Sequence, residues 1–285
     1  MTDTEISSKA YQIRESIITM LEAAGSGHSA GPLGLADIFA TLYFREMNHR
    51  PEQPDWADRD RLILSCGHTC PVLYASLAEA GYFQKDELKT LRKFGTRLQG
   101  HPHNLGLPGV ETSSGPLGQG LSQAIGFALA ARLEGCRHRT YAILSDGEHQ
   151  EGQIWEAIML AGNYKLNTLV VTIDRNNIQI DGPTETVMPL EPLAEKYRAF
   201  NWHVIEVDGH SVAGLSAAYA EARAITEKPV CVLAHTIPGK GVSYMEYDYR
   251  WHGNPPGLAD QAGAPPKGEQ AAVALHDLRQ HAYHA

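Results

Sequence analysis

Residues 140–178 read TYAILSDGEHQEGQIWEAIMLAGNYKLNTLVVTIDRNNI and contain two short apolar runs with a helix-length stretch between them. The runs at 140–144 and 168–174 have the length of buried strands, and residues 150–163 have the length and apolar spacing of a helix. A strand, a helix and a second strand in this order favour two parallel strands joined by a crossover helix. This stretch therefore predicts an α/β fold.

The same alternation continues towards the C-terminus after a loop that runs through Pro183. Continuous apolar strands separated by helices are typical of a parallel sheet covered by helices on both faces, which is the fold class we expect. The expected elements are a helix at 190–200, a strand at 203–207, a helix at 214–225, a strand at 230–234 and a short final helix at 269–281.

Towards the N-terminus, apolar residues recur at helical spacing in two segments. Ile13, Ile17 and Leu21 predict a helix that ends at Gly25. A second helix follows, with one buried stripe formed by Leu35, Ile38, Phe39 and Leu42, and the run at 61–65 predicts a short strand. We expect one domain over residues 1–268, with residues 269–285 as a tail or short helix.

The composition excludes several classes of protein. With 43% hydrophobic and 20% charged residues in 285, the chain is neither disordered, collagenous nor a membrane protein. Its formal charge of −9 would repel a nucleic acid backbone. The N-terminus lacks a secretory signal and the four cysteines are scattered, so a reducing cytoplasm is expected. Cys66 and Cys70 could hold a metal with a histidine, but no second cysteine pair at zinc-finger spacing follows them.

Residues 95–120 form a glycine- and proline-rich loop with no apolar period. A loop of this length inside a compact domain is usually functional or disordered. It ends in GPLGQG at 115–120 and leads directly into a helix marked by Leu121, Ile125 and Leu129. A glycine-rich turn before a helix is a place where backbone N–H groups can hold an anion.

Polar residues follow the two strands of the central unit. Asp146 comes after the first strand and Asn176 after the second. If the strands are neighbours, their side-chain oxygens and a backbone carbonyl just beyond Asn176 can converge on Mg²⁺, while Gly147 lets a phosphate come close to the backbone. Asp, Asn and Gly are also ordinary turn residues, and the spacing alone leaves both interpretations open.

Histidines give the second signal for a site. The chain has fourteen, and several lie beside a glycine in loops. A loop histidine with a flexible neighbour is more suggestive of a site than one on an apolar helix face, although each one alone can also be a solvated loop residue. The five beside glycines are His28, His68, His101, His210 and His252, whereas His281 and His284 belong to the C-terminal tail.

These motifs together resemble a known family. The segments SDGE at 145–148 and DRN at 174–176 resemble the thiamine diphosphate motif. From about Ile13 to Gly253, the order and spacing of further motifs resemble the N-terminal domain of transketolase. The further motifs are GSGH at 25–28, SCGH at 65–68, GHP at 100–102, GVET at 109–112, GPLGQG at 115–120, GKGVS at 239–243 and WHG at 251–253.

The resemblance implies roles for particular residues. It implies thiamine diphosphate as cofactor, held through Mg²⁺ or another divalent cation such as Ca²⁺ or Mn²⁺. It also implies substrate-side histidines that bind sugar hydroxyls and assist proton transfer. The assignments are Asp146, Asn176 and the carbonyl of Ile178 for the metal; Gly147 and His68 for the diphosphate; Gly115, Pro116 and Leu117 for the cofactor rings; and His28, His101 and His252 for the substrate, with His252 also beside the cofactor.

Three departures from the family pattern stand out. Ser145 replaces the usual first glycine of the diphosphate motif, and Cys66 stands where asparagine is more common. Residues 103–107 read HNLGL, where the family commonly has an acidic sequence, and they are expected near the entrance to the substrate site. Acceptor preference is therefore the property least transferable from the family.

The resemblance also implies a partner. Full-length transketolases continue into a pyrimidine-binding domain, whose glutamate activates the cofactor, and a C-terminal domain, whereas this chain stops at Ala285. We therefore expect the N-terminal subunit of a two-chain transketolase, inactive alone, that transfers a two-carbon ketol unit between sugars or sugar phosphates in an assembly of two copies of each chain. Glu151 and Glu156 are expected at the cofactor interface, or are helix-surface carboxylates.

Other functions stay open at this point. The chain could be a subunit of another thiamine diphosphate enzyme, of the 2-oxoacid dehydrogenase alpha or deoxyxylulose-phosphate synthase type. It could also be a non-catalytic protein that only binds the cofactor, although such a protein would not need the substrate-side histidines. A magnesium hydrolase using Asp146 and a histidine is disfavoured because no paired carboxylates at two-metal spacing are evident.

Overall fold

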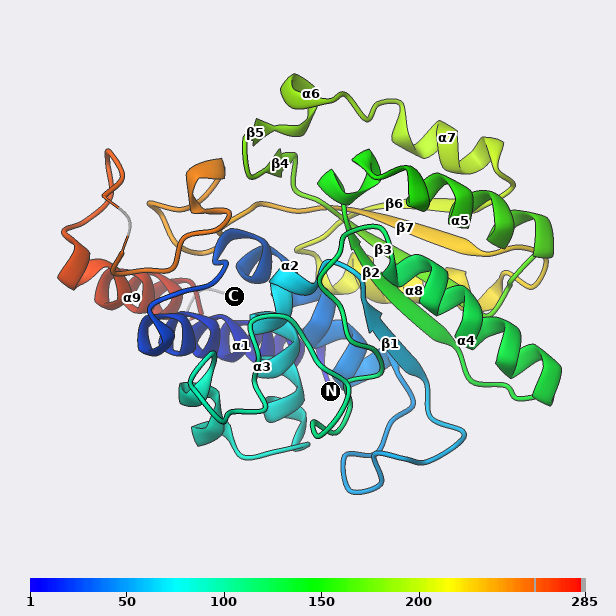
Figure 1. The fold of residues 1–285 in the computed structure, drawn as a ribbon, viewed down its shortest axis with the longest axis horizontal. Helices are drawn as coiled ribbons and strands as arrows, with labels where there is room; N and C mark the ends of the chain where they lie inside the picture. Colours follow the sequence, from blue (N-terminus) through cyan, green and yellow to red (C-terminus); the bar gives the residue numbers. More distant parts are fainter. Residues whose placement is uncertain (259, 283–285) are drawn as a thin grey trace.

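The computed structural model describes residues 1–258 and 260–282, and its centre is a five-stranded parallel sheet (Figure 1). Each strand pairs in parallel with its neighbour, which confirms the predicted fold class. In sheet order the strands are β1 (Arg61–Leu64), β2 (Thr140–Ser145), β3 (Leu169–Arg175), β7 (Val230–His235) and β6 (His203–Asp208).

Helices cover both faces of this sheet because successive strand residues point to opposite sides. Leu62 packs into one core and Ile63 into the other. One face is covered by α1 (Asp3–Ala24), α2 (Ala30–Thr41), α3 (Cys70–Ala80) and α8 (Val212–Ala224), and the other by α4 (Gly120–Glu134), α5 (Gly152–Tyr164) and α7 (Leu193–Ala199) (Figure 1).

The helix ends follow ordinary capping rules. Thr2 caps α1 through a reciprocal pair of hydrogen bonds with Glu5, and the helix ends at Gly25 in the left-handed conformation with φ 61°. The final helix, α9 (Gln270–Ala282), packs against α1 and contributes Leu278 to the core. The division at residue 268 stays a prediction. None of the described helices is both long and apolar enough to cross a bilayer.

Three expectations about secondary structure were wrong or incomplete. Every residue of α2 is buried, not one stripe, because this helix contacts α1, α3 and α8. A π-helical turn, Leu42–Glu46, extends it. Helix α3 was not predicted, because it is apolar around most of its surface and so shows no helical period. The expected loop through Pro183 contains a small hairpin, β4 (Ile178–Gln179) and β5 (Gly182–Pro183), and the short helix α6 (Thr184–Val187).

Two helix glycines offer a matched test of this packing. A Cβ on Gly162 in α5 would overlap the carbonyl oxygen of Phe200, whereas a Cβ on Gly126 in α4 would meet nothing within 4 Å. We expect Gly162→Ala to lower the free energy of unfolding by about 2 kcal/mol and Gly126→Ala to raise it by up to about 1 kcal/mol. Urea denaturation measures both; equal effects would contradict this packing.

Candidate active site

The ends of β2 and β3 meet at one edge of the sheet, as the metal-site hypothesis requires. The two strands are neighbours, and Ser145 is level with Asp174. The amide of Asp146 donates to the carbonyl of Asp174 at 3.1 Å. The turns that carry Asp146 and Asn176 therefore lie beside each other, at the carboxyl edge where ligands bind in parallel α/β sheets.

The carboxylate of Asp146 is fully buried and held by several donors. Its Oδ1 accepts from the Gly147 amide at 2.7 Å. Its Oδ2 accepts from the Asn177 amide at 2.7 Å and from Nη1 of Arg175 at 2.9 Å. Burial raises the pKa of Asp146 to about 6, against the opposing effect of Arg175. A cation bound here would favour the ionised carboxylate.

The surrounding residues fit a hard divalent cation. The Asn176 amide is fixed by two hydrogen bonds, with Nδ2 donating to Asp174 at 2.8 Å and Oδ1 accepting from the Ile178 amide at 3.0 Å. A Cβ on Gly147 would lie 3.1 Å from the Gln179 Cβ and 3.9 Å from the Ile178 carbonyl oxygen. A side chain at this position would therefore narrow the cavity between Gly147 and residues 178–179. Within residues 1–258 and 260–282, no three His, Cys, Asp or Glu side chains converge as a metal site. A cation would therefore need amide and carbonyl oxygens as well as one carboxylate.

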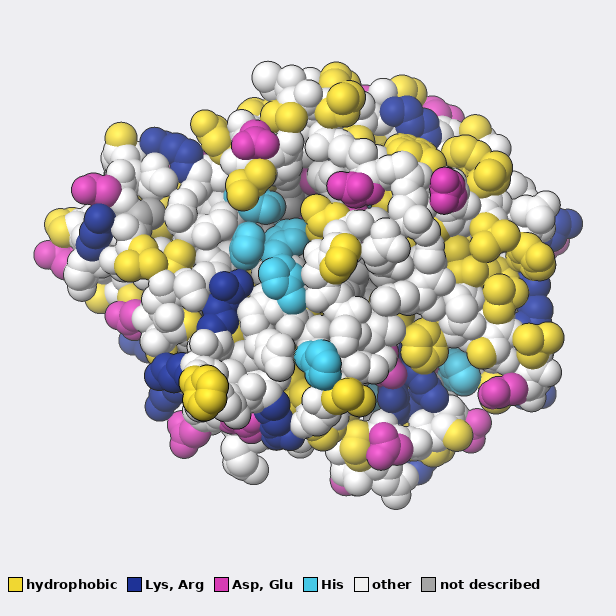
Figure 2. All heavy atoms as spheres, in the orientation of Figure 1, with side chains coloured by type: hydrophobic (Ala, Val, Ile, Leu, Met, Phe, Trp, Pro, Cys, Tyr) yellow, Lys and Arg dark blue, Asp and Glu magenta, His cyan; other side chains and the backbone are white. Residues whose placement is uncertain are grey.

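Three of the predicted histidines form a tight cluster. Ring centroids lie 4.9 Å apart for His28 and His68, 5.4 Å for His28 and His252, and 5.1 Å for His68 and His252. Figure 2 shows histidine side chains gathered in a hollow of the surface. This cluster lines a cavity of about 370 Å³, and the other predicted site residues in the lining are His101, Gly115, Leu117, Gly147, Asn176 and Ile178.

The environment keeps these imidazoles neutral near pH 7. Burial lowers the pKa of His28 to about 3, with further lowering by His252, Arg92 and His101. Burial likewise lowers the pKa of His68, His101 and His252. In the described part of the chain, Nδ1 of His28 and Nδ1 of His252 are buried without a hydrogen-bond partner. Two of the histidines that line the cavity therefore keep an unpaired ring nitrogen.

The depressed pKa of His28 makes a prediction about stability in acid. Below pH 6.5 the unfolded chain binds a proton at His28 that the folded chain does not, so this site destabilises the fold as pH falls. In the natural chain we expect protonation at His28 to lower the free energy of unfolding by about 2 kcal/mol between pH 7.5 and pH 5. In His28→Gln this contribution should be absent. Urea denaturation of both proteins at both pH values isolates this difference; equal losses would contradict it.

Some predicted residues lie outside the cavity lining. Pro116 is exposed on its turn, and Asp146 is buried next to the lining, bonded to Gly147. The thiols point to separate partners: Cys66 Sγ lies 3.4 Å from Oγ1 of Thr69, and Cys70 Sγ lies 3.3 Å from the carbonyl of Gly100. Glu151, the residue before α5, lines the cavity, whereas Glu156 on α5 is exposed outside it.

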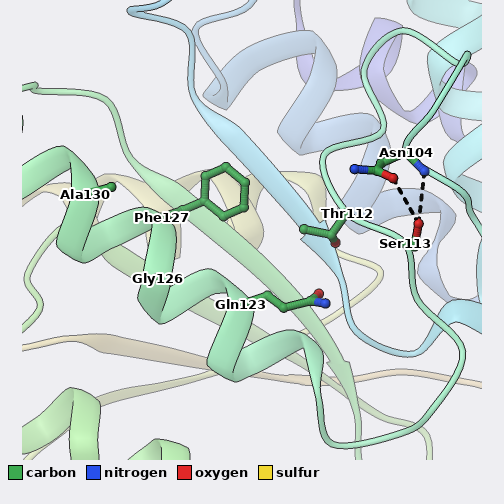
Figure 3. Close-up of a pocket in the computed structure, with 7 residues that line it drawn as sticks. All are labelled: Asn104, Thr112, Ser113, Gln123, Gly126, Phe127 and Ala130. Atoms are coloured by element: carbon green, nitrogen blue, oxygen red, sulfur yellow. Dashed lines mark hydrogen bonds between the residues drawn. The ribbon is translucent and has the colours of Figure 1, made fainter.

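A second hollow, of about 590 Å³, lies between α4 and the loop before it (Figure 3). Phe127 and Gln123 project from the helix, and Ser113 on the loop bonds to Asn104, a member of the divergent stretch 103–107. None of the seven lining residues is titratable, so the hollow offers no acid–base chemistry. The seven are Asn104, Thr112, Ser113, Gln123, Gly126, Phe127 and Ala130.

Arg175 and Glu148 are two of the buried charged residues at this edge to which sequence reasoning assigned no role. Arg175 joins Asp146 to the following segment, since its Nη2 donates to Glu185 at 2.8 Å and to Glu191 at 2.9 Å. The sequence contained a signal for this role, because Arg175 lies between Asp174 and Asn176 at the end of a predicted strand and two glutamates follow it. Glu148 lies fully buried in the turn after β2 and lines the cavity.

Comparison with known proteins agrees with this geometry. Residues 7–265 match the family model described as transketolase, thiamine diphosphate binding domain. The chain is 43% identical over 242 residues to a 6-deoxy-6-sulfo-D-fructose transketolase subunit of Clostridium sp. (strain MSTE9), covering 85% of this chain and 88% of the relative. It is 38% identical over 239 residues to an apulose-4-phosphate transketolase subunit of Phocaeicola vulgatus, covering 84% of this chain and 85% of the relative.

Solved structures lead to the same family. The transketolase from Leishmania mexicana superimposes with a TM-score of 0.85 at 35% identity, covering 98% of this chain. The chain spans only 44% of the length of that protein. These relatives confirm the predicted resemblance to one subunit of a transketolase-type enzyme. The chain therefore belongs to the transketolase family, and residues 7–265 form its thiamine diphosphate-binding domain.

Proposed function

We propose that this chain is the N-terminal subunit of a transketolase that moves a two-carbon ketol unit from a ketose, or its phosphate, to an aldose acceptor. The cofactors are thiamine diphosphate and a divalent cation, with Mg²⁺ the first candidate and Ca²⁺ or Mn²⁺ as alternatives. One observation carries the proposal: oxygen ligands suited to a cation and a cluster of neutral histidines adjoin a single cavity. A protein that only bound the cofactor would not need the histidines.

The cofactor half of the site would be divided among three groups. Asp146, Asn176 and the carbonyl of Ile178 would hold the cation, which neutralises the diphosphate. His68 and Gly147 would contact the diphosphate, and the turn at 115–117 would lie along the cofactor rings. When bound, thiamine diphosphate supplies the carbon that carries the two-carbon unit.

The substrate half would depend on His28, His101 and His252. A neutral imidazole can accept a proton from a sugar hydroxyl as the carbon–carbon bond breaks and return it to the carbonyl oxygen of the acceptor. The unpaired Nδ1 atoms of His28 and His252 are consistent with this role because each ring retains an unused hydrogen-bonding atom. Burial favours the uncharged form that must first accept a proton.

A partner chain is part of the proposal. Both similar proteins described above are named as subunits, and we infer a partner with a pyrimidine-binding domain and two copies of each chain. Exposed apolar side chains on α4 and α5 support a protein partner, and Figure 2 shows hydrophobic side chains gathered over this part of the surface. They are Leu133, Met159, Leu160 and Tyr164. Free, mostly buried thiols support a cytoplasmic location.

Reconstitution tests the proposal. Ketol transfer is measured with Mg²⁺ and thiamine diphosphate, for the chain alone and with a candidate pyrimidine-domain chain. We expect turnover only for the pair, because the two relatives that this chain matches over most of their length are named as subunits. Full turnover by the purified single chain would refute this expectation.

A substrate panel separates the proposal from the other thiamine diphosphate enzymes. The names of the two relatives refer to a sulfonated and a phosphorylated sugar, so both kinds of ketose belong in the panel with unmodified ketoses. Turnover of ketoses supports ketol transfer. Turnover of pyruvate alone would instead support a 2-oxoacid dehydrogenase or deoxyxylulose-phosphate synthase type.

A further inference from the structure

The carboxylate of Glu148 joins three separate segments of the chain. The side chain is fully buried in the turn after β2. Its Oε1 accepts from the Gly118 amide at 2.8 Å and from the hydroxyl of Ser65, which directly follows β1. Its Oε2 accepts from the Ser145 amide at 3.2 Å. Two strand ends and the glycine-rich turn therefore share one acceptor group.

The glycine-rich turn is packed closely against this acceptor. Oγ of Ser65 accepts from the Gly120 amide at 3.1 Å, so this hydroxyl links Gly120 to Glu148, whereas Gly118 bonds to the carboxylate directly. A Cβ on Gly120 would overlap Ser65, and a Cβ on Gly118, at φ +81°, would lie 2.9 Å from the Cβ of Glu151. Only glycines at these two positions let the turn lie this close to Ser65 and Glu151.

We propose that Glu148 is a positioning residue that fixes the 115–118 turn relative to the diphosphate end of the cavity. This inference rests on the proposed function, in which residues 115–117 lie along the cofactor rings and Gly147 faces the diphosphate. Gly115 and Leu117 form one wall of the cavity, the turn wall, and Gly147 lies on the other, the diphosphate wall. The distance between these two walls depends on the hydrogen bonds that connect them. Glu148 is one residue from Gly147 and bonds directly to Gly118.

A carboxylate suits this position because it has only acceptor atoms and faces three donors. Burial raises the pKa of Glu148 to about 7, and the three donors oppose this rise by stabilising the ionised form. Glutamine keeps one acceptor oxygen, but its NH₂ group cannot accept a hydrogen bond. Either the Ser145 amide or both donors to Oε1, the Gly118 amide and the Ser65 hydroxyl, therefore lose their acceptor. Alanine leaves the Gly118 and Ser145 amides without this acceptor, so the turn is no longer held to the strand ends.

Two probes separate the two walls of the cavity. Calorimetric titration of the full chain with Mg²⁺ and inorganic pyrophosphate reports the diphosphate wall, and titration with Mg²⁺ and thiamine diphosphate reports both walls. For Glu148→Ala we expect about tenfold weaker binding of thiamine diphosphate and less than a twofold change for pyrophosphate. Glu148→Gln should recover part of the loss, and Glu134→Gln, an exposed carboxylate on α4, should change neither.

Ser65→Ala provides a second variant in case Glu148→Ala does not fold. It keeps the carboxylate and its bonds to Gly118 and Ser145 and removes the link to Gly120, so we expect the same selectivity with a smaller loss. An equal loss of affinity for pyrophosphate and thiamine diphosphate would overturn the assignment. So would unchanged affinity for thiamine diphosphate in both Glu148→Ala and Ser65→Ala. If the natural chain fails to bind pyrophosphate with Mg²⁺, the proposed cofactor site is contradicted, and this inference falls with it.

Discussion

Asp146→Asn should lower the kcat/KM of ketol transfer by the reconstituted enzyme by about 1000-fold. Asparagine keeps the size of the side chain but removes its negative charge, and the other proposed ligands, Asn176 and the carbonyl of Ile178, are neutral. Loss of the only anionic ligand should cost several kcal/mol of the charge stabilisation that a cation gives to the diphosphate, which corresponds to about three powers of ten in rate. The assay is made with Mg²⁺ varied at saturating thiamine diphosphate.

The matched control is Asp86→Asn, which removes an exposed carboxylate that does not line the cavity. It should leave kcat/KM within twofold. Full activity of Asp146→Asn at low Mg²⁺ concentration would show that the cation, if it acts, is bound elsewhere.

His28→Gln should lower kcat by at least about 100-fold, which is the lower end of the contribution of a general acid or base. Glutamine can still donate and accept hydrogen bonds at the cavity, but it cannot take up and return a proton. Binding of Mg²⁺ with pyrophosphate should change by less than twofold, because His28 is assigned to the substrate side. Single-turnover measurements with a ketose separate kcat from substrate binding.

His281→Gln, on the exposed end of α9, is the control and should behave like the natural chain. An unchanged kcat in His28→Gln would remove His28 from the proton-transfer role. A parallel loss of pyrophosphate binding would instead place His28 with the diphosphate contacts.

The sheet could be predicted because its central strands, β2, β3 and β7, are buried on both faces. β2 and β3 are apolar along most of their length, so their bounds could be estimated within about one residue. Complete burial had the opposite effect on helices. α3 has almost no polar face, so the period that identifies a surface helix is missing from its sequence.

The candidate site was partly predictable for a similar reason. Asp146 and Asn176 follow recognisable strands, and the structure supplies the missing fact that these strands are neighbours. Glu148 could not be assigned, since an acidic residue in a turn is normally solvated. Its burial depends on Ser65 and Gly118, which lie 83 and 30 residues away in the sequence, and no local pattern reports such contacts.

The most direct test of the cation site is a crystal of this chain with its partner, thiamine diphosphate and Mn²⁺, measured at the manganese absorption edge. We predict an anomalous peak bonded to Asp146, the amide oxygen of Asn176 and the carbonyl oxygen of Ile178, next to the diphosphate. A peak at another position, with Asp146 still bonded only to Arg175 and backbone amides, would contradict the proposed cation site.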